Sequence, residues 1–378
     1  MRIALFCHSL ISDWNHGNAH FLRGLVSELV ARGHQVRAWE PEDAWSVVSL
    51  EKDTGALPLA EVAEQYPLLD ITRYREPELD LDAATDGADV VLVHEWNSPK
   101  LVSALGRRRE RGAGFLLLFH DTHHRMVSEA NFGELDLAGY DGVLAFGEAL
   151  RQRYLARGWG DRVFTFHEAA DVRVFRPLPE HEPTKELVFV GNWGDGERTA
   201  ELEEFVLEPA AALGLSGTVY GVRYPEAGLA AVAKAGLAFG GHLPNYRVPL
   251  AFARHQVTVH VPRRPYVEAL PGIPTIRVFE ALACGIPLIS APWSDSEGLF
   301  RKDDFMMVHS SAEVRAALRT LRHDAAARRQ LAKRGLETVL ARHTCSHRVN
   351  ELLHIVRTLG KRSAEPRLTG EAGVSAWD

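Results

Sequence analysis

The alternation of short apolar runs with amphipathic stretches constrains the fold of this 378-residue chain more than any other feature. Runs of strand length alternate with stretches of helical length, a pattern typical of a parallel sheet covered by helices. In the first half, the predicted strands are residues 3–7, 35–39, 90–94, 115–119, 142–146 and 163–166. Residues 18–31 repeat apolar side chains at helical spacing, and Gly33 follows as a C-cap. We therefore predict an α/β, doubly wound fold.

A second α/β series follows a polar segment with three prolines, residues 176–186. Its predicted strands are residues 187–190, 218–221, 257–261 and 287–291, with helices at 200–213, 228–235 and 276–283 and Arg-rich helices from residue 312 onward. At roughly 100 to 200 residues per domain, the length also favours two domains. We predict two Rossmann-like domains facing across a cleft, spanning residues 1–175 and 176–358, and a flexible tail at 359–378 that has few large apolar residues.

The net charge of −7 is divided unequally between the two halves. Residues 1–180 carry 19 Lys and Arg against 28 Asp and Glu, a balance of −9, whereas residues 181–378 carry 24 against 22, a balance of +2. An acidic chain without a basic stripe is a poor nucleic-acid binder. We therefore expect no nucleic-acid partner, while the second half remains suited to a small anion.

Cysteine content and hydropathy favour a reducing, cytoplasmic compartment. The three cysteines have no metal-ligand spacing and cannot all pair, which favours a reducing environment. No run approaches the roughly 18 apolar residues of a transmembrane helix, and the opening apolar run is too short for a signal peptide. We expect a cytoplasmic protein without a transmembrane segment; its oligomeric state is open.

The loop after the first predicted strand, residues 8–18, leads into a helix whose free N–H groups could accept an anion or a polar sugar. Gly17 would permit a close backbone approach, although a simple turn is an alternative interpretation. His16 and His20 lie four residues apart but lack the glutamate of a helical zinc motif, so we expect no metal there.

The segment 119–125, Phe-His-Asp-Thr-His-His-Arg, follows an apolar strand. Ligands bind at the carboxyl edge of open α/β sheets, so His120 could contact a sugar or orient a reacting group, and Asp121 could accept a proton. A loop network that satisfies itself and a metal cluster are the alternatives.

A glycine-rich segment, residues 191–198, joins the strand 187–190 to a helix. Gly191 would allow backbone amides to approach a phosphate, and Arg198 could bind that phosphate through two hydrogen bonds. The spacing is not Gly-x-Gly-x-x-Gly, which disfavours a nicotinamide cofactor, and a plain turn is the alternative.

The pattern of residues 271–287 predicts a loop, a short helix and a helix-ending glycine before the next strand. Thr275 would cap the helix, leaving the amides of Thr275 and Ile276 for an anion. Glu280 lies within this otherwise apolar helix, where a carboxylate is costly unless bonded. Two sugar hydroxyls or a structural arginine would each suit it.

These motifs together resemble the two-domain glycosyltransferases of the B-type fold, particularly the retaining sugar-nucleotide enzymes of family 4 and their spore-maturation-like relatives. The resemblance covers residues 1 to about 358. Its most diagnostic part is Glu-Ala-x-Ala-Cys-Gly-x-Pro, which stands at 280–287. Supporting matches are Gly33-His34-Gln35-Val36, the crossing segment 171–177 and the Phe-Val-Gly at 189–191.

The resemblance implies a transferase that moves a sugar from a nucleoside diphosphate to an unknown acceptor, with retention and without a metal ion or other cofactor. It implies that Glu280 holds the ribose, that Arg198 stabilises the leaving diphosphate and that His120 contacts the donor sugar. We assign His120, Asp121 and Arg198 to catalysis. Residues assigned to donor binding are Gly17, Asn18, Gly191, Asn192, Arg198, His242, Leu243, Gly272, Thr275, Ile276 and Glu280, and residues assigned to acceptor binding are His16 and His123.

Two positions depart from the family pattern. The usual first glutamate of Glu-x7-Glu would stand at 272, where Gly272 is found, and Glu268 is a possible substitute. Asn192 occupies the place of a basic residue. Two alternatives follow: a non-catalytic nucleotide-sugar-binding or assembly protein, and a sugar-nucleotide epimerase of the same fold.

Overall fold

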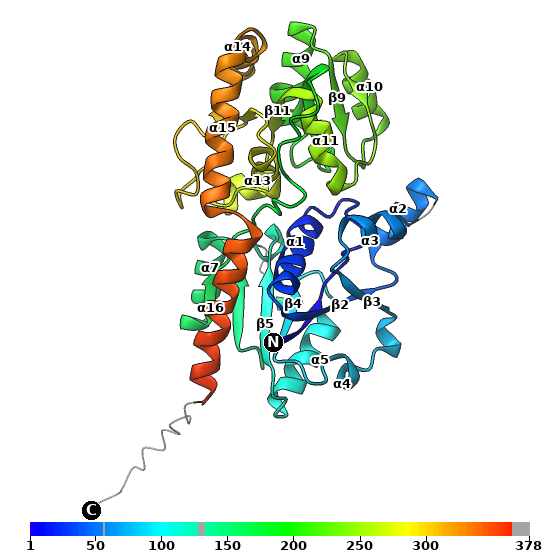
Figure 1. Cartoon of the computed structure of the whole chain (residues 1–378), viewed down its shortest axis with the longest axis vertical. Coiled ribbons are helices and arrows are strands. Elements are labelled where there is room, and N and C mark those ends of the chain that lie inside the picture. Colours follow the sequence, from blue (N-terminus) through cyan, green and yellow to red (C-terminus); the bar gives the residue numbers. More distant parts are fainter. Residues whose placement is uncertain (56, 128–132, 365–378) are drawn as a thin grey trace, which may run out of the picture.

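The computed structural model describes residues 1–55, 57–127 and 133–364 and arranges them in two parallel sheets, each covered by helices (Figure 1). The first sheet has the order β3-β2-β1-β4-β5-β6-β7. Its strands are β1 (Arg2–Phe6), β2 (Gln35–Pro41), β3 (Asp70–Tyr74), β4 (Val90–His94), β5 (Leu116–Asp121), β6 (Gly142–Ala145) and β7 (Val163–Thr165). Its helices are α1 (Asn18–Ala31), α2 (Trp45–Thr54), α3 (Leu59–Gln65), η1 (Glu76–Glu78), α4 (Leu81–Ala84), α5 (Pro99–Glu110), η2 (His124–Val127), α7 (Glu148–Leu155) and η3 (Gly160–Arg162).

The second sheet has the order β10-β9-β8-β11-β12-β13. Its strands are β8 (Lys185–Val190), β9 (Gly217–Tyr220), β10 (Ala238–Phe239), β11 (His255–His260), β12 (Leu288–Ser290) and β13 (Met306–Met307). Its helices are α8 (Thr199–Leu202), η4 (Glu203–Leu207), α9 (Glu208–Leu213), α10 (Glu226–Lys234), η5 (Asn245–Arg247), α11 (Val248–Ala253), α12 (Arg264–Ala269), α13 (Ile276–Ala283), α14 (Ser311–His323) and α15 (Ala325–Arg342). One more helix, α16 (Cys345–Ala364), follows in the chain.

Both sheets share one topology, in which the chain runs to one edge, returns to the middle and continues to the other edge. The direction reverses between β1 and β4 in the first sheet and between β8 and β11 in the second. Such switch points leave a crevice at the carboxyl ends of the strands, where ligands bind in open α/β sheets. The fold therefore provides two candidate crevices.

Apolar packing joins the two domains. One buried cluster contains Leu5 and Phe21 of the first domain together with Phe252 and Phe279 of the second. Two further clusters cover the other faces of the first and second sheets. Because one core crosses the domain boundary, the structure holds the two domains in contact.

The final helix, α16, returns to the first domain. It packs against α1 and β5, and Figure 1 shows it running down the side of the lower domain. Arg32 fastens α1 to the start of α16 by donating to the Ser346 hydroxyl at 2.7 Å. Residues up to 358 were assigned to the second domain from sequence, but α16 lies on the first sheet. It also continues through Ala364, so the predicted tail begins too early at 359; residues 365–378 lie outside the described residues.

The predicted α/β architecture of two doubly wound sheets is confirmed. Sequence patterning missed β3, β10 and β13, which all lie at sheet edges. β3 is polar, and β10 and β13 have two residues each, so none presents a long apolar run. Edge strands pair on one side only and tolerate such sequences.

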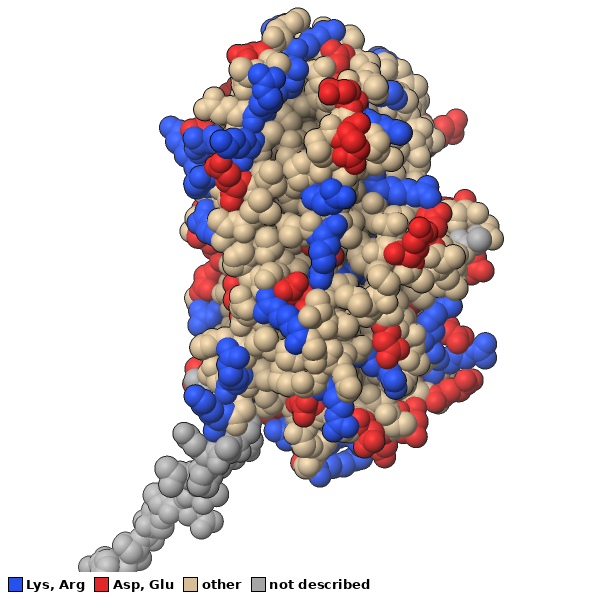
Figure 2. Space-filling model, viewed as in Figure 1, with Lys and Arg blue, Asp and Glu red and all other residues tan. Residues whose placement is uncertain are grey.

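Basic side chains gather on one part of the second-domain surface. Figure 2 shows Lys and Arg side chains gathered over α14 and α15 at the upper left of the second domain. Within the described residues, no helix has the length and hydropathy needed to cross a bilayer. The cytoplasmic location stays a prediction.

Candidate functional site

A cleft between the domains collects the residues that follow the strands of both sheets. On the first-domain side it is lined by Asp13, Asn15, His16, Gly17, Asn18, Trp45, Trp96, Thr122, His123, Phe146 and Glu168. On the second-domain side it is lined by Val190, Gly191, Asn192, Arg198, Tyr220, Gly221, Val222, His242, Leu243, Asn245, Arg263, Tyr266, Thr275, Ile276 and Arg277. The two crevices therefore form one site.

Aromatic side chains gather in one part of the cleft, four from the first domain and one, Tyr266, from the second. Trp45 begins α2, and Trp96 follows β4. Their ring centres lie 5.9 Å apart in an edge-to-face arrangement, and the ring of His123 lies 4.9 Å from that of Trp96. Tyr266 of α12 lies 6.2 Å from His123 and 6.1 Å from Phe146. These five residues are called the aromatic wall below.

Two buried polar groups beside the aromatic wall have an atom without a partner. Glu168 is 4% exposed, and its Oε1 has no hydrogen bond among the described residues. His16 is 3% exposed, and its Nε2 also has no hydrogen bond among the described residues. Burial raises the pKa of Glu168 well above its ordinary value, and Glu280 raises it further; burial lowers the pKa of His16, so its ring is neutral. An unsatisfied buried polar atom costs about 1–3 kcal/mol, and a ligand hydroxyl would remove that cost.

Three arginines, Arg198, Arg263 and Arg277, line the second-domain side of the cleft and are called the arginine group. Arg198 donates to the carbonyl oxygen of Asn192 at 3.1 Å and to that of Val261 at 2.9 Å, which fixes its orientation. Burial and the nearby Arg263 lower the pKa of Arg198 to about 10, so it remains charged at neutral pH. The arrangement provides positive charge for an anion.

The start of α13 adds backbone donors beside the arginine group. Thr275 occupies the N-cap position, but its hydroxyl makes no cap bond and instead contacts Nε2 of His260 at 3.0 Å. Thr275 is therefore the N-cap residue, as predicted, but its side chain does not satisfy a backbone amide of the helix. A helix N-terminus without a side-chain cap has amides available and attracts anions.

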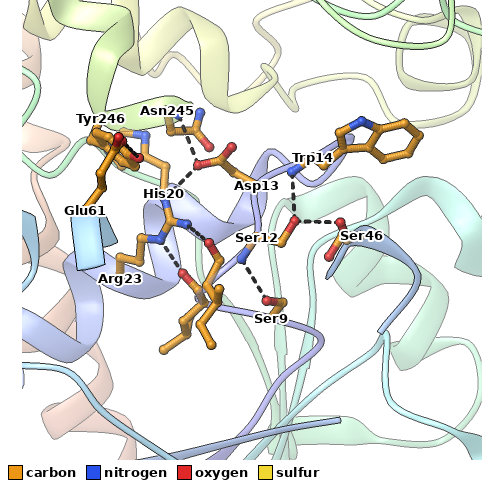
Figure 3. Close-up of polar contacts among 12 residues, drawn as sticks. Ser9, Ser12, Asp13, Trp14, His20, Arg23, Ser46, Glu61, Asn245 and Tyr246 are labelled. Atoms are coloured by element: carbon orange, nitrogen blue, oxygen red, sulfur yellow. Dashed lines mark hydrogen bonds and ion pairs between the residues drawn. The ribbon is translucent and has the colours of Figure 1, made fainter. Parts of the chain in front are cut away.

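Asp13 ties the two sides of the cleft together, as Figure 3 shows. Its Oδ2 accepts hydrogen bonds from Nη1 of Arg23 at 2.8 Å and from the backbone N–H of Asn245 at 3.0 Å. Its Oδ1 lies 3.0 Å from Nε2 of His242. Burial alone would raise the pKa of Asp13, but Arg23 and His242 lower it well below its ordinary value. The charged carboxylate thus fastens the loop after β1 to the second domain.

Most of the predicted site residues lie at this cleft. The structure brings together His16, Gly17, Asn18, His123, Gly191, Asn192, Arg198, His242, Leu243, Thr275 and Ile276 as lining residues. The roles assigned to them in binding or catalysis stay predictions. Four predicted residues, His120, Asp121, Gly272 and Glu280, do not line the cleft.

His120 and Asp121 lie behind the cleft wall because both belong to β5 itself. The buried ring of His120 lies 5.6 Å from that of Phe166 and 5.4 Å from that of His94, and burial lowers its pKa to about 3. Asp121 accepts a hydrogen bond from the Tyr154 hydroxyl at 2.7 Å. The structure corrects their expected position: the strand runs two residues further than predicted, so the residues of this segment that line the cleft are Thr122 and His123.

Glu280 is fully buried and engaged by protein groups. Its Oε1 lies 2.7 Å from Nδ1 of His20 and accepts from Nδ2 of Asn245 at 3.3 Å, while its Oε2 forms an ion pair with Arg277. Of the two partners considered from sequence, sugar hydroxyls and a structural arginine, this structure contains the arginine. Direct contact of Glu280 with a ligand would require Arg277 or Asn245 to move.

The backbone conformation at position 272 requires glycine. Its φ of 93° lies in the left-handed region, and an added Cβ would meet Oγ of Ser296 at 2.7 Å and Cγ of Glu297 at 2.9 Å. A glutamate at this position would be strained and crowded, so the departure from the family pattern has a steric reason. Glu268 is exposed on α12 and does not line the cleft, so it does not substitute.

Sequence reasoning missed several lining residues. Trp96 follows the predicted strand 90–94, Glu168 follows 163–166 and Arg263 follows 257–261, each by two residues. The carboxyl-edge rule applied to every strand would have found these three. Trp45, Arg277 and Asn245 carry no comparable signal.

Acidic and histidine residues offer no evident metal site. Within residues 1–55, 57–127 and 133–364, no group of three or more His, Cys, Asp or Glu side chains could hold a metal ion. Asp80 and Asp82, which match a metal-binding Asp-x-Asp pattern, instead cap α4 and pair with Arg108.

One protein-family model matches part of the chain, mainly in the second domain. Residues 198–354 match the family model described as "Glycosyl transferase-like". No curated protein sequence matches the chain.

Solved structures share the whole fold. A sucrose-phosphate synthase from Thermosynechococcus elongatus is 15% identical, with a TM-score of 0.66 over 96% of this chain and 100% of that one. Anabaena HepE, solved with UDP and glucose, is 12% identical, with a TM-score of 0.65 over 95% and 100%. T4 phage BGT, solved with UDP and Mn²⁺, is 14% identical, with a TM-score of 0.61 over 94% and 99%. The B-type glycosyltransferase fold expected from sequence is confirmed by these structures, and residues 198–354 are similar to the glycosyl transferase-like family.

Proposed function

We propose that this chain, a B-type glycosyltransferase by fold and by the family match in its second domain, transfers a sugar from a nucleoside diphosphate to an acceptor in the cleft. The observation that carries the proposal is that the arginine group and the uncapped start of α13 line the same cleft as the aromatic wall. One side suits a leaving diphosphate and the other suits an acceptor.

The chemistry follows from charge stabilisation. The bond between the anomeric carbon and the diphosphate oxygen breaks, a bond from that carbon to the acceptor oxygen forms, and the acceptor proton passes to the diphosphate. Arg198, Arg263 and Arg277 stabilise the negative charge that develops on the departing diphosphate. Such electrostatic stabilisation of the transition state is the largest single contribution to rate acceleration in many enzymes. This positive charge supports transfer without a metal ion, with the nucleotide sugar as the only co-substrate.

Retention at the anomeric carbon is part of the proposal and rests on the resemblance to family 4. The donor nucleotide to test first is uridine diphosphate, because HepE and BGT were both solved with UDP. Since the BGT structure also contains Mn²⁺, metal dependence needs a direct test.

The experiment incubates the purified protein with a panel of nucleotide sugars and neutral acceptors, with EDTA or with added Mn²⁺, and follows released nucleoside diphosphate. We expect release with one donor in the presence of EDTA and an unchanged anomeric configuration by NMR. Release only with Mn²⁺ would contradict metal independence, and an inverted product would contradict retention. Nucleotide binding without release from any donor would favour a binding protein, and an isomerised donor would favour an epimerase.

A further inference from the structure

The aromatic wall presents ring faces and edges to the cleft beside hydrogen-bonding groups. Trp45, Trp96, His123 and Tyr266 are half-buried, so part of each side chain remains accessible. Their neighbours are also aromatic: His8 stacks on Trp45 at 4.5 Å, and His16 meets Trp45 edge to face at 6.4 Å. Packed supports of this kind hold the accessible rings in place for a ligand.

Glu168 provides the hydrogen-bonding partner that an apolar wall alone would lack. It lies three residues beyond β7, where Phe146, beyond β6, and Thr122, beyond β5, also line the cleft. A carboxyl group with an unpartnered, buried oxygen can bind ligand hydroxyl groups. Nε2 of His16 offers a second unpartnered atom in the same cleft.

The first-domain side of the cleft has no basic side chain for an anionic ligand. Among the lining residues that the structure describes on this side, none is Lys or Arg, and the carboxylate of Asp13 is already paired with Arg23. The charged group of a uronic acid, a sugar phosphate or a nucleic acid would therefore lose hydration without gaining a counter-ion from this side. A neutral ring with apolar faces and several hydroxyl groups meets the aromatic wall and Glu168 without such a penalty.

We propose that the acceptor is a neutral sugar whose ring packs on Trp96 and Trp45 and whose hydroxyl groups bind Glu168. This inference rests on the proposed function, because it names the second substrate of the same cleft. Glu168 is then a specificity-determining residue.

The test measures binding of neutral saccharides to the UDP-loaded protein by isothermal titration calorimetry. The panel contains glucose, galactose, mannose, their disaccharides, glucuronic acid, glucose 6-phosphate and a short DNA duplex. We expect at least one neutral saccharide to bind at least tenfold more tightly than the three anionic ligands. Tighter binding of an anionic ligand, or binding of none of the panel, would overturn the proposal.

Variants assign the binding to the residues named. Glu168→Ala and Trp96→Ala should each weaken the saccharide at least tenfold, whereas Glu168→Gln, which keeps a donor and an acceptor, should weaken it less than Glu168→Ala does. UDP affinity should change less than twofold in all three, which also shows that the variants are folded. Unchanged saccharide affinity in both alanine variants, with UDP still bound, would overturn the inference.

The same measurements separate the inference from the proposed function. If the saccharide binds as expected but the wild-type protein does not bind UDP, the donor half of the proposed function fails. If UDP binds and is lost in Arg198→Met while no saccharide binds, the acceptor inference alone fails.

Discussion

The two sides of the cleft use different chemistry although they are built on the same sheet topology. The first-domain side carries aromatic rings and two carboxylates, and the second-domain side carries three arginines and the amides at the start of α13. Each side includes residues at the carboxyl edge of its sheet: Trp96 and Glu168 follow β4 and β7, and Arg198 and Arg263 follow β8 and β11. The fold thus fixes where ligands bind, while the residues in the loops decide what each side binds.

The charge division of the whole chain agrees with this difference. The first 180 residues have a balance of −9 and the remainder +2. Net charge over a half shows only its general character, but the lining residues have the same signs as the halves that contribute them. Asp13 differs from the other charged lining residues because its carboxylate already binds His242 and the backbone of Asn245 in the second domain.

The largest expected effect comes from breaking that fastening. Asp13→Ala leaves the guanidinium of Arg23 buried without its partner, and breaking a buried pair costs about 3–5 kcal/mol. Chemical denaturation should show this loss in the free energy of unfolding. The control is Asp82→Ala, which removes an exposed partner of Arg108 and should cost about 0–1 kcal/mol; equal losses in the two variants would contradict a special role for Asp13.

Removing charge from the second-domain side should mainly affect turnover. Arg198→Met removes one donor to the leaving diphosphate, and loss of such a donor lowers kcat by about 10²- to 10³-fold. Steady-state kinetics with saturating donor measures this. Arg319→Met, on the exposed face of α14, is the matched control and should leave kcat unchanged; a similar kcat for both variants would remove Arg198 from the reaction.

Buried histidines should make the protein sensitive to acid. Burial lowers the pKa of His120 from 6.5 to about 3, so below about pH 6.5 the unfolded chain binds a proton that the folded chain does not. The free energy of unfolding therefore falls as the pH falls, by about 1.4 kcal/mol per pH unit for this residue, or about 2 kcal/mol at pH 5. Denaturation of His120→Phe at pH 7, 6 and 5 should show a shallower dependence.

A second histidine checks the generality of that effect. Burial also lowers the pKa of His260 to about 3, but His260 hydrogen-bonds Ser290 and Thr275. His260→Phe should flatten the pH dependence equally and cost more stability at pH 7, because it leaves two hydroxyls without that partner. A wild-type pH dependence in both variants would show that neither histidine is responsible.

The smallest of these effects is expected on the first-domain side. Trp96→Ala removes a ring from the aromatic wall and should raise the KM for the acceptor about tenfold, equivalent to about 1.4 kcal/mol. The KM for the donor should stay within twofold. Trp159→Ala, a tryptophan outside the cleft, is the control, and a rise in the donor KM of Trp96→Ala would contradict the separation of the two sides.

Much of the fold was predictable because most strands are buried runs. The strand at 90–94 was predicted with the bounds that β4 has, and the predicted helices 18–31 and 276–283 have the bounds of α1 and α13. The edge strands were missed because pairing, not sequence, makes them strands. The return of α16 to the first domain was also missed, since amphipathicity indicates a buried face without saying what covers it.

The site was predictable only where strand ends are clear. Gly191, Asn192 and Arg198 were found because glycines between a strand and a helix indicate an open loop. His120 was misplaced because the strand continues through Asp121, which buries both side chains. Trp45 was missed because it lies six positions beyond the end of the predicted strand at 39.

The sequence by itself determined two α/β domains, a strongly apolar α13 and an acidic half beside a near-neutral one, because hydrophobic periodicity and charge are local properties of the chain. Only the tertiary structure decided that Asp13 meets His242 and Asn245, that Glu280 meets His20, and that Gly272 has no room for a side chain. Those outcomes depend on contacts between residues more than 200 positions apart or on a backbone angle, and neither leaves a pattern in neighbouring residues.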